Sequence, residues 1–390
     1  MPKLAYDNRQ FYGDVYQTSP KVSEVRRLSD YNRSPITTTA VRRKSKKPSF
    51  LQQIISITFF SLIAIFILPL GFQKVTKSLI HGSPYNYIKT NYHNLRFPTT
   101  NYLSNDLLFN ERYWSPVKIK NPQMIQIPES YEMTDLENRI KYIMSLYPSV
   151  KPSVYVWHYN TERFVDINAS DIYSAASIIK IPVLIELFRS IEKNQLSLEE
   201  KMTLTDFYRA EGSGGLQYKA ENSDWSIDTL ARIMITDSDN SATNMLMAKL
   251  GSMTDINSAI RQWGLKHTHV QTWLPDMTGN NKTTSRDIAT MLYNIDNNEK
   301  FLNINSREKI FDYMGHVHNS RLIKAGLGSG ALFMHKTGDI GKMLGDAGIV
   351  FTPNGQKYIV VILANRPHNS VAGKDFIVKA SAEIYNYLAR

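Results

Sequence analysis

The amino-acid sequence predicts an α/β (α+β) domain over residues 135–390, built on an antiparallel sheet that helices flank. Strand-like runs lie at both ends of this region, over 153–168 and 331–365, whereas residues 196–320 have the pattern of helices and loops. Strands from distant segments must therefore meet in one sheet. The stretch between them, about 196–320, forms an inserted all-helical lobe.

The first elements follow from apolar spacing and from the residues that end or connect them. Apolar side chains recur at helical spacing over 135–147, and Pro148 ends that helix. Strands over 153–159 and 163–168 are joined by a short turn. A second helix starts near Ser177 and runs to about residue 191.

The C-terminal part predicts three more strands and a last helix. Strand-like runs lie over 331–337, 345–352 and 357–365, and a Pro-Asn-Gly turn at 353–355 joins the last two. A helix over 374–389 completes the domain.

An uncharged segment over residues 48–73 precedes the domain, and Ile54 to Leu70 within it are almost wholly apolar. A run of this length is typical of a helix that crosses a bilayer. We therefore expect a single transmembrane helix in contact with membrane lipid. A cleavable signal peptide fits less well, because the preceding segment is long and no small-residue cleavage site follows Gly71.

Most of the net charge of +11 lies before this apolar run, since residues 1–50 hold eleven Lys or Arg against four Asp or Glu. Basic residues beside a membrane segment stay in the cytoplasm and need no nucleic-acid partner. We expect residues 1–47 to be a disordered cytoplasmic tail, and the domain to be extracytoplasmic on a bacterial cell membrane. Residues 74–134 form a stalk or an extension that wraps the domain, and the sequence leaves both open.

Ser177 and Lys180 form the first motif that carries chemistry. Positions i and i+3 share one face of a helix, which brings the Lys180 amine near the Ser177 hydroxyl. A serine hydroxyl needs a base to become a nucleophile, and a lysine can serve once burial lowers its pKa. The apolar neighbours of Lys180 favour such burial. Alone, this spacing also fits a capping serine beside an unrelated lysine.

Ser238 and Asn240 belong to a second motif, Ser-Asp-Asn, which follows an apolar helical pattern. A hydroxyl at Ser238 can pass a proton to a leaving nitrogen. The Asn240 amide can bind a carbonyl of the substrate. The alternative is an ordinary loop at the end of a helix.

A third motif, Lys336-Thr337-Gly338, lies in a strand-like run. Lys336 can attract a substrate carboxylate, Thr337 adds a hydroxyl, and Gly338 lets a ligand approach the backbone closely. The backbone N–H groups of Ser177 and Asp339 then form a candidate oxyanion pair. No metal site or cofactor is indicated. The sequence has no cysteine, which excludes disulfides, cysteine-ligated metals and a thiol nucleophile.

The three motifs occur in a fixed order, separated by 61 and 98 positions. This set resembles class A β-lactamases and penicillin-binding proteins over roughly residues 135–390. The resemblance implies a two-lobed fold and an acyl-enzyme on Ser177, with Lys180 as base directly or through water. It also implies that Ser238 relays a proton, and that Lys336 and Thr337 hold the carboxylate of a penicillin or a cell-wall peptide.

One expected residue is missing from the segment 264–284. Class A β-lactamases carry a glutamate there that activates the deacylating water, but this segment contains no Glu, and Trp273-Leu274-Pro275 falls about where it is expected. Asp276 is the only carboxylate of the segment, and we interpret it as a turn residue. Without a base for water the acyl-enzyme persists.

Three functions are therefore compared. The first is a serine hydrolase that opens β-lactams. The second is a D,D-peptidase or related amidase that acts on cell-wall peptides and releases its acyl group slowly. The third is a catalytically silent module that senses peptidoglycan, against which the joint presence of Ser177, Lys180, Ser238 and Lys336 argues.

Overall fold

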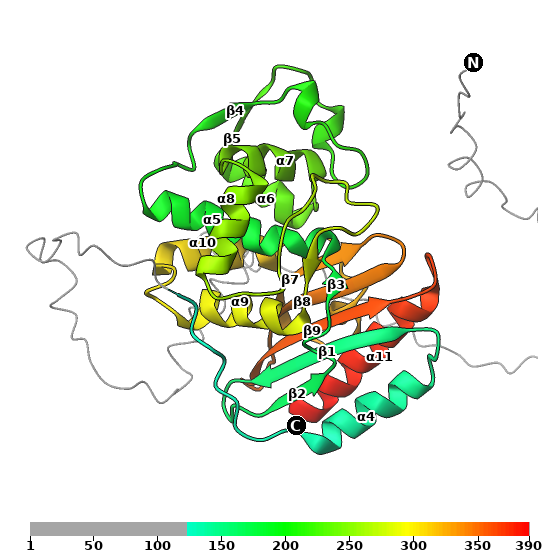
Figure 1. Cartoon of the computed structure of the whole chain (residues 1–390). Coiled ribbons are helices and arrows are strands. Elements are labelled where there is room, and N and C mark those ends of the chain that lie inside the picture. Colours follow the sequence, from blue (N-terminus) through cyan, green and yellow to red (C-terminus); the bar gives the residue numbers. More distant parts are fainter. Residues whose placement is uncertain (1–122, 390) are drawn as a thin grey trace, which may run out of the picture. The chain divides into compact units, whose positions relative to one another are not determined.

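A computed structural model describes residues 123–389, which form a five-stranded antiparallel sheet with helices on both faces (Figure 1). The strand order is β2-β1-β9-β8-β7. The strands are β1 (Lys151–His158), β2 (Phe164–Ile167), β7 (Leu332–Asp339), β8 (Met343–Phe351) and β9 (Lys357–Asn365). Strand β1 pairs with β9 along its whole length, so the two ends of the domain meet in one sheet as predicted.

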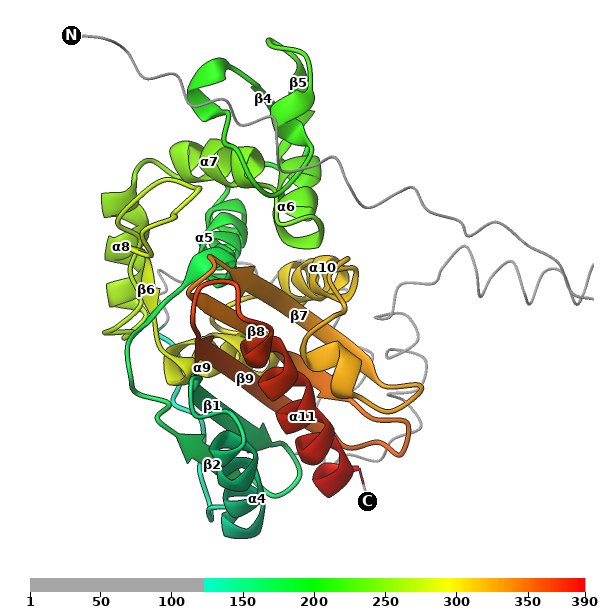
Figure 2. The ribbon, with the colours of Figure 1, turned by 90° about the vertical axis from the view of Figure 1, so that its right-hand side faces the viewer.

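Two helices from opposite ends of the domain cover one face of the sheet, α4 (Thr134–Ser145) and α11 (Val371–Leu388). Figure 2 shows both lying across this face. Leu136 and Ile140 of α4 pack with Phe376 and Ile384 of α11 over the apolar side chains of the strands. This core packs on one face of the sheet, and the candidate active site lies on the opposite face.

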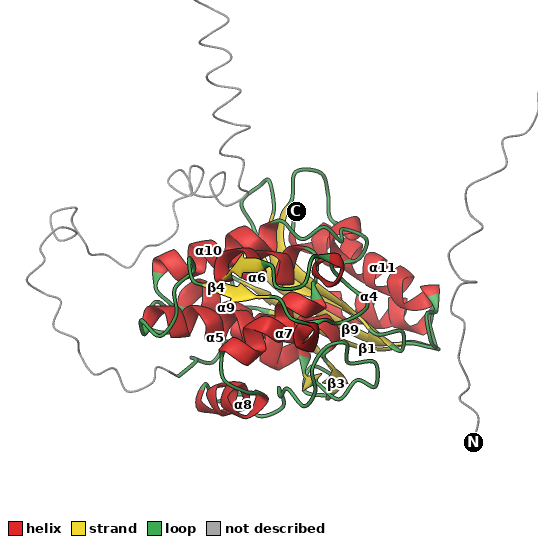
Figure 3. Cartoon of the chain, turned by 90° about the horizontal axis from the view of Figure 1, so that it is seen from above, coloured by secondary structure: helices red, strands yellow, loops and turns green. Residues whose placement is uncertain are grey.

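The opposite face carries α9 (Ser285–Asn297) and a lobe rich in helices (Figure 3). The lobe contains α5 (Lys180–Glu192), α6 (Ile227–Thr236), α7 (Asn240–Lys249), α8 (Met253–Gln262) and α10 (Ile304–Gly315). The predicted all-helical lobe of 196–320 needs three corrections. A small sheet of β4 (Lys201–Thr203) and β5 (Asp224–Ser226) lies within it. Strand β6 (Lys282–Thr283) pairs with β3 (Tyr173–Ser174), and α9 packs its apolar face on the main sheet.

Residues 123–133 run along the domain before α4. The backbone N–H of Ile125 donates to Asn294 Oδ1 at 2.8 Å, and the Trp157 indole donates to the Pro128 carbonyl at 2.6 Å. Glu129 pairs with Arg286 at 2.7 Å. The end of the predicted segment 74–134 is thus part of the domain surface.

The other N-terminal predictions lie outside the described residues, namely the tail 1–47, the apolar segment 48–73 and residues 74–122. None of the helices within residues 123–389 is long and apolar enough to cross a membrane.

Candidate active site

Ser177 lies in a 3₁₀ turn, Ala176–Ile179, directly before α5. The predicted helix therefore begins as a 3₁₀ turn, and the α-helix proper starts at Lys180. Ala176 has a φ of +44°, a left-handed conformation that a residue with a Cβ adopts at a cost. This turn places the Ser177 hydroxyl at a cleft, while Ile178 and Ile179, the next two residues, are buried in the core.

Lys180 is fully buried, and its amine is surrounded by oxygen atoms of the predicted motifs. Its Nζ lies 3.1 Å from Ser177 Oγ, 3.1 Å from Ser238 Oγ and 2.6 Å from the Ser238 carbonyl oxygen. The Asn240 Oδ1 accepts a further bond at 2.9 Å. The structure thus joins the first two motifs through one amine.

Lys336 brings the third motif to the same point. Its Nζ lies 3.0 Å from Ser238 Oγ and 2.9 Å from the Thr337 carbonyl oxygen. Ser238 Oγ therefore lies between two amines and can exchange protons with both. Ser238 has a φ of +56°, so a second left-handed residue shapes the site.

The two lysines have unusual electrostatics. Burial lowers the pKa of Lys180 well below its ordinary value, and the nearby Lys336 charge lowers it further. Burial also lowers the pKa of Lys336, to about 7, although Asp346 opposes the shift. A neutral amine can accept a proton from a hydroxyl, so Lys180 has the character of a general base.

Asp239 and Asn240 connect this centre to the loop that precedes it. The Asp239 carboxylate accepts the N–H of Leu216 and of Ala242, each at 2.8 Å, and so also caps the N-terminus of α7. Asn240 is 6% exposed, and its amide donates to the Glu211 carbonyl at 2.8 Å. Contact of Asn240 with a substrate carbonyl stays a prediction, since both ends of its amide bind protein groups here.

Gly338 packs directly against the turn that carries Ser177. A Cβ at this position would lie 3.1 Å from the Ala176 Cβ and 3.2 Å from the Ile178 nitrogen. Strand β7 is an edge strand, so alternate backbone groups point away from β8. Ser177 and Asp339 line the same cleft, and the oxyanion pair of their backbone N–H groups stays a prediction.

A cleft of about 390 Å³ opens at Ser177. Six predicted site residues line it: Ser177, Ser238, Lys336, Thr337, Gly338 and Asp339. Lys180 does not line the cleft but is bonded to Ser177 and Ser238, which do. Asn240 is connected to these groups through its bond to Lys180.

One wall of the cleft was not predicted from the sequence. Asp237 and His318 line it and pair through Nδ1 and Oδ1 at 3.0 Å. The His318 backbone N–H donates to the Thr236 carbonyl at 3.1 Å, which fixes this wall to the end of α6. The sequence offers one signal for this wall, the position of Asp237 beside Ser238. His318 has no such signal, because it comes from a distant loop.

Comparison with known proteins agrees with this geometry. The profile of the beta-lactamase enzyme family matches residues 135–388. The chain belongs to the beta-lactamase enzyme family. This confirms the resemblance found in the sequence, and the α/β fold with its antiparallel sheet agrees with the solved members.

Several solved structures and curated β-lactamases are similar to this chain. PBP-A is 34% identical with a TM-score of 0.65, covering 68% of this chain and 99% of its own. A leucine-to-glutamate variant of PBP-A was solved as an acyl-enzyme with penicillin G. The β-lactamase of Streptomyces albus G is 23% identical over 59% of this chain and 77% of its own length. A β-lactamase from Sphaerobacter thermophilus, at 20% identity and a TM-score of 0.59, shares the fold.

In this beta-lactamase-family chain, the side chains of Asn244 and Asp276 fix the backbone of the loop 264–284. Asn244 on α7 accepts the Leu274 N–H at 3.0 Å and donates to the Leu274 carbonyl at 2.8 Å. The buried Asp276 accepts the backbone N–H of Asn280 at 2.8 Å and of Asn281 at 2.7 Å. Asp276 therefore closes a turn of its own loop, in agreement with its interpretation as a turn residue.

Beneath the site, His335 and Asp346 form a buried pair, with Nδ1 and Oδ1 2.8 Å apart. The second Asp346 oxygen accepts the N–H of Ile323 at 3.1 Å. His335 stacks on Phe333, as expected for a strand-packing residue. Asp346 lies within β8, inside the strand-like run predicted over 345–352.

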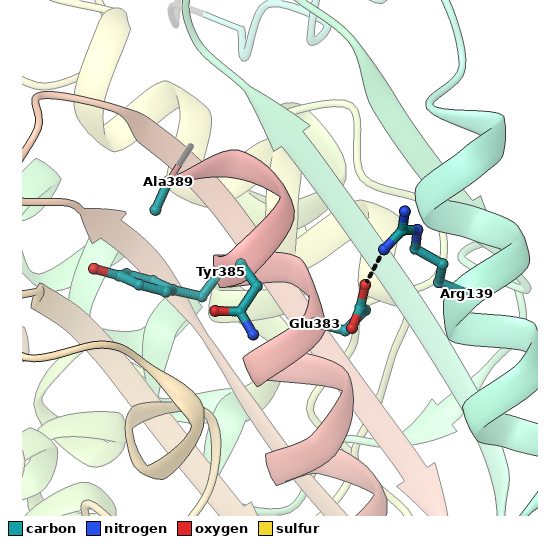
Figure 4. Close-up of a pocket in the computed structure, with 5 residues that line it drawn as sticks. Arg139, Glu383, Tyr385 and Ala389 are labelled. Carbon is teal, nitrogen blue, oxygen red and sulfur yellow. Dashed lines mark hydrogen bonds and ion pairs between the residues drawn. The ribbon is translucent and has the colours of Figure 1, made fainter.

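A second hollow, of about 420 Å³, lies at α4 and α11 on the other side of the sheet (Figure 4). Arg139 and Glu383 pair across it at 2.9 Å. Its labelled side chains are Arg139, Glu383, Tyr385 and Ala389, and none of them belongs to the three sequence motifs.

Proposed function

We propose that the protein is a serine hydrolase that opens β-lactam rings, or related amide bonds, through an acyl-enzyme on Ser177. One observation carries the proposal. The buried Lys180 amine, whose pKa is lowered, lies 3.1 Å from both the Ser177 and the Ser238 hydroxyl oxygens. A base thus contacts both the nucleophile and the group that can protonate a leaving nitrogen.

The acylation step follows from these contacts. Lys180 takes the Ser177 proton as Oγ attacks the carbonyl carbon, and the negative charge that develops on the carbonyl oxygen faces the backbone N–H groups of Ser177 and Asp339. The proton then passes from Lys180 to Ser238 and on to the leaving nitrogen, and the C–N bond breaks. Lys336 and Thr337 hold the substrate carboxylate beside this path.

The described residues of 264–284 offer no free carboxylate for deacylation. Hydrolysis of the ester needs a base for water, and the one carboxylate of 264–284 is occupied by backbone N–H groups of its own loop. Asp276 is thereby committed to loop structure. We therefore expect the acyl-enzyme to be long-lived.

A long-lived acyl-enzyme favours a second candidate, a D,D-peptidase or related amidase of cell-wall peptides that β-lactams inhibit. Similarity to PBP-A supports this candidate, because a leucine-to-glutamate variant of PBP-A was solved as an acyl-enzyme with penicillin G. The silent sensor module is disfavoured, because Ser177, Lys180, Ser238 and Lys336 are joined by hydrogen bonds into one centre.

A fluorescent penicillin separates these functions. The full-length chain is incubated with the probe, while covalent label and ring opening are followed together. Rapid turnover supports the β-lactamase, and a stable stoichiometric label supports the peptidase. Absence of label with wild type and with Ser177→Ala alike would refute the nucleophile assignment.

For its location, we propose that residues 48–73 anchor the chain in a bacterial cell membrane, with the domain outside. The apolar run and the preceding basic cluster support this orientation. Externally added protease should then digest the domain on intact spheroplasts and spare an epitope placed before residue 47. Protection of the domain would overturn the orientation.

A further inference from the structure

Asp339 places a carboxylate at the active-site cleft, immediately after Gly338. Its side chain is 51% exposed. The Asp339 Oδ1 accepts the Gly341 N–H at 2.8 Å and the Arg366 Nη2–H at 2.7 Å. The acid is therefore held in one place by a turn and by one cation.

Arg366 is the buried member of this pair, with 7% of its side chain exposed. It follows β9, and its other groups donate to the Gly341 and Ser370 carbonyls, each at 3.0 Å. The guanidinium thus contacts Asp339, and Asp339 lines the Ser177 cleft whereas Arg366 does not.

The position of the acid matters for substrate charge. Lys336 and Thr337, three and two positions earlier in the same strand, line the same cleft, and Lys336 supplies it with positive charge. An uncompensated carboxylate at Asp339 would repel a substrate carboxylate held there. The pairing with Arg366 removes most of that repulsion.

We propose that Arg366 is a specificity-determining residue, which neutralises Asp339 so that the cleft accepts acyl donors that carry a carboxylate. This inference rests on the proposed function. Arg366 acts through Asp339 and is a positioning residue, since its contacts are to Asp339 and to the turn.

A purely structural role makes a different prediction. Loss of the bonds to Gly341 and Ser370 would disturb the turn for every substrate equally. Loss of charge compensation weakens only those substrates that carry a carboxylate, and it weakens them less at high salt because the Asp339 side chain is half exposed.

Benzylpenicillin and its methyl ester provide the test, because they differ in the carboxylate. In the full-length chain, Arg366→Gln should slow acylation by benzylpenicillin about tenfold or more and change acylation by the ester less than about twofold. Adding Asp339→Asn should restore the rate with benzylpenicillin. Arg139→Gln is the matched control, because it removes an arginine from another ion pair, that with Glu383 on the far side of the sheet. It should change the acylation rate with neither substrate.

Equal losses for both substrates, or no rescue by Asp339→Asn, would overturn the proposal. Binding in a Ser177→Ala background keeps the test independent of acylation. There, Arg366→Gln should weaken benzylpenicillin selectively, and an unchanged ratio of the two dissociation constants would also overturn it. Failure of the wild-type protein to form an acyl-enzyme would instead contradict the proposed function. The ratio of the two dissociation constants in the Ser177→Ala background would then still test the role of Arg366.

Discussion

Lys180 Nζ lies 3.1 Å from Ser177 Oγ, with Ser177 in the 3₁₀ turn that precedes α5 and Lys180 at the first position of α5. The same amine contacts both oxygen atoms of Ser238 that face it, so one buried group links two motifs that are 61 positions apart. The consequences of this arrangement can be tested by substitution.

Replacing Lys180 by methionine removes the base and keeps the volume of the side chain. Acylation of Ser177 should fall by about 10²–10⁴-fold, measured as the rate of labelling by a fluorescent penicillin. Lys193→Met, at the exposed end of the same helix, is the control and should label at the wild-type rate. An acylation rate of Lys180→Met within tenfold of wild type would contradict the assignment.

The pH dependence of acylation should report Lys336. Burial lowers the pKa of Lys336 to about 7. The amine is charged below this pH and attracts a substrate carboxylate, and this attraction is lost as the pH rises through about 7. Acylation by benzylpenicillin should therefore decline above pH 7, while acylation by its methyl ester should not.

Lys336→Arg tests the same point, since an arginine stays charged throughout this range. The variant should lose the decline above pH 7, whatever its absolute rate. If the acylation rate declines with the same midpoint pH in wild type and in Lys336→Arg, the decline belongs to a group other than Lys336.

Gly338→Ala should separate β7 from the turn of Ser177. The new Cβ would lie 3.1 Å from the Ala176 Cβ, tighter than ordinary contact, and we expect the strand and the turn to shift apart by a few tenths of an ångström. Displacement of one oxyanion donor is expected to slow acylation by about 10²-fold. The melting temperature should fall little, because only the edge strand and this turn shift. Wild-type acylation in this variant would show that the close approach is unnecessary.

Deacylation should respond to a carboxylate introduced at Leu274. This position precedes Pro275 in the segment where a glutamate is expected, and Asn244 fixes its backbone. Leu274→Glu should release the acyl group about 10²-fold faster or more, measured by recovery of free enzyme.

Asp276→Asn is the companion to that variant. It should destabilise the loop by about 1–3 kcal/mol, because buried N–H groups lose a charged acceptor, and leave the wild-type deacylation rate unchanged. A slower release in Asp276→Asn would make Asp276 the deacylating base and refute the account of the loop.

The sequence was sufficient for elements whose periodicity is long and regular. Strand 357–365 was predicted at its observed bounds. The strand-like patterns of β1 and β9 also predicted that segments distant in the sequence join in one sheet. The spacing of Ser177 and Lys180 also sufficed to place them together, since helix geometry alone determines that contact.

Other features depend on tertiary structure. The strands of β4 and β5 have three residues each, too few to show a period. The 3₁₀ turn at Ser177 depends on Ala176 in a left-handed conformation, which alanine seldom adopts. His318 reaches the cleft only because its backbone binds the end of α6, a contact without a local sequence signal.

The most direct measurement is intact mass spectrometry of the full-length chain after mixing with benzylpenicillin, followed by peptide mapping. The account predicts a mass increase equal to one penicillin, located on Ser177, that persists for many minutes and is absent in Ser177→Ala. An adduct on another residue, or an equal adduct in Ser177→Ala, would contradict it.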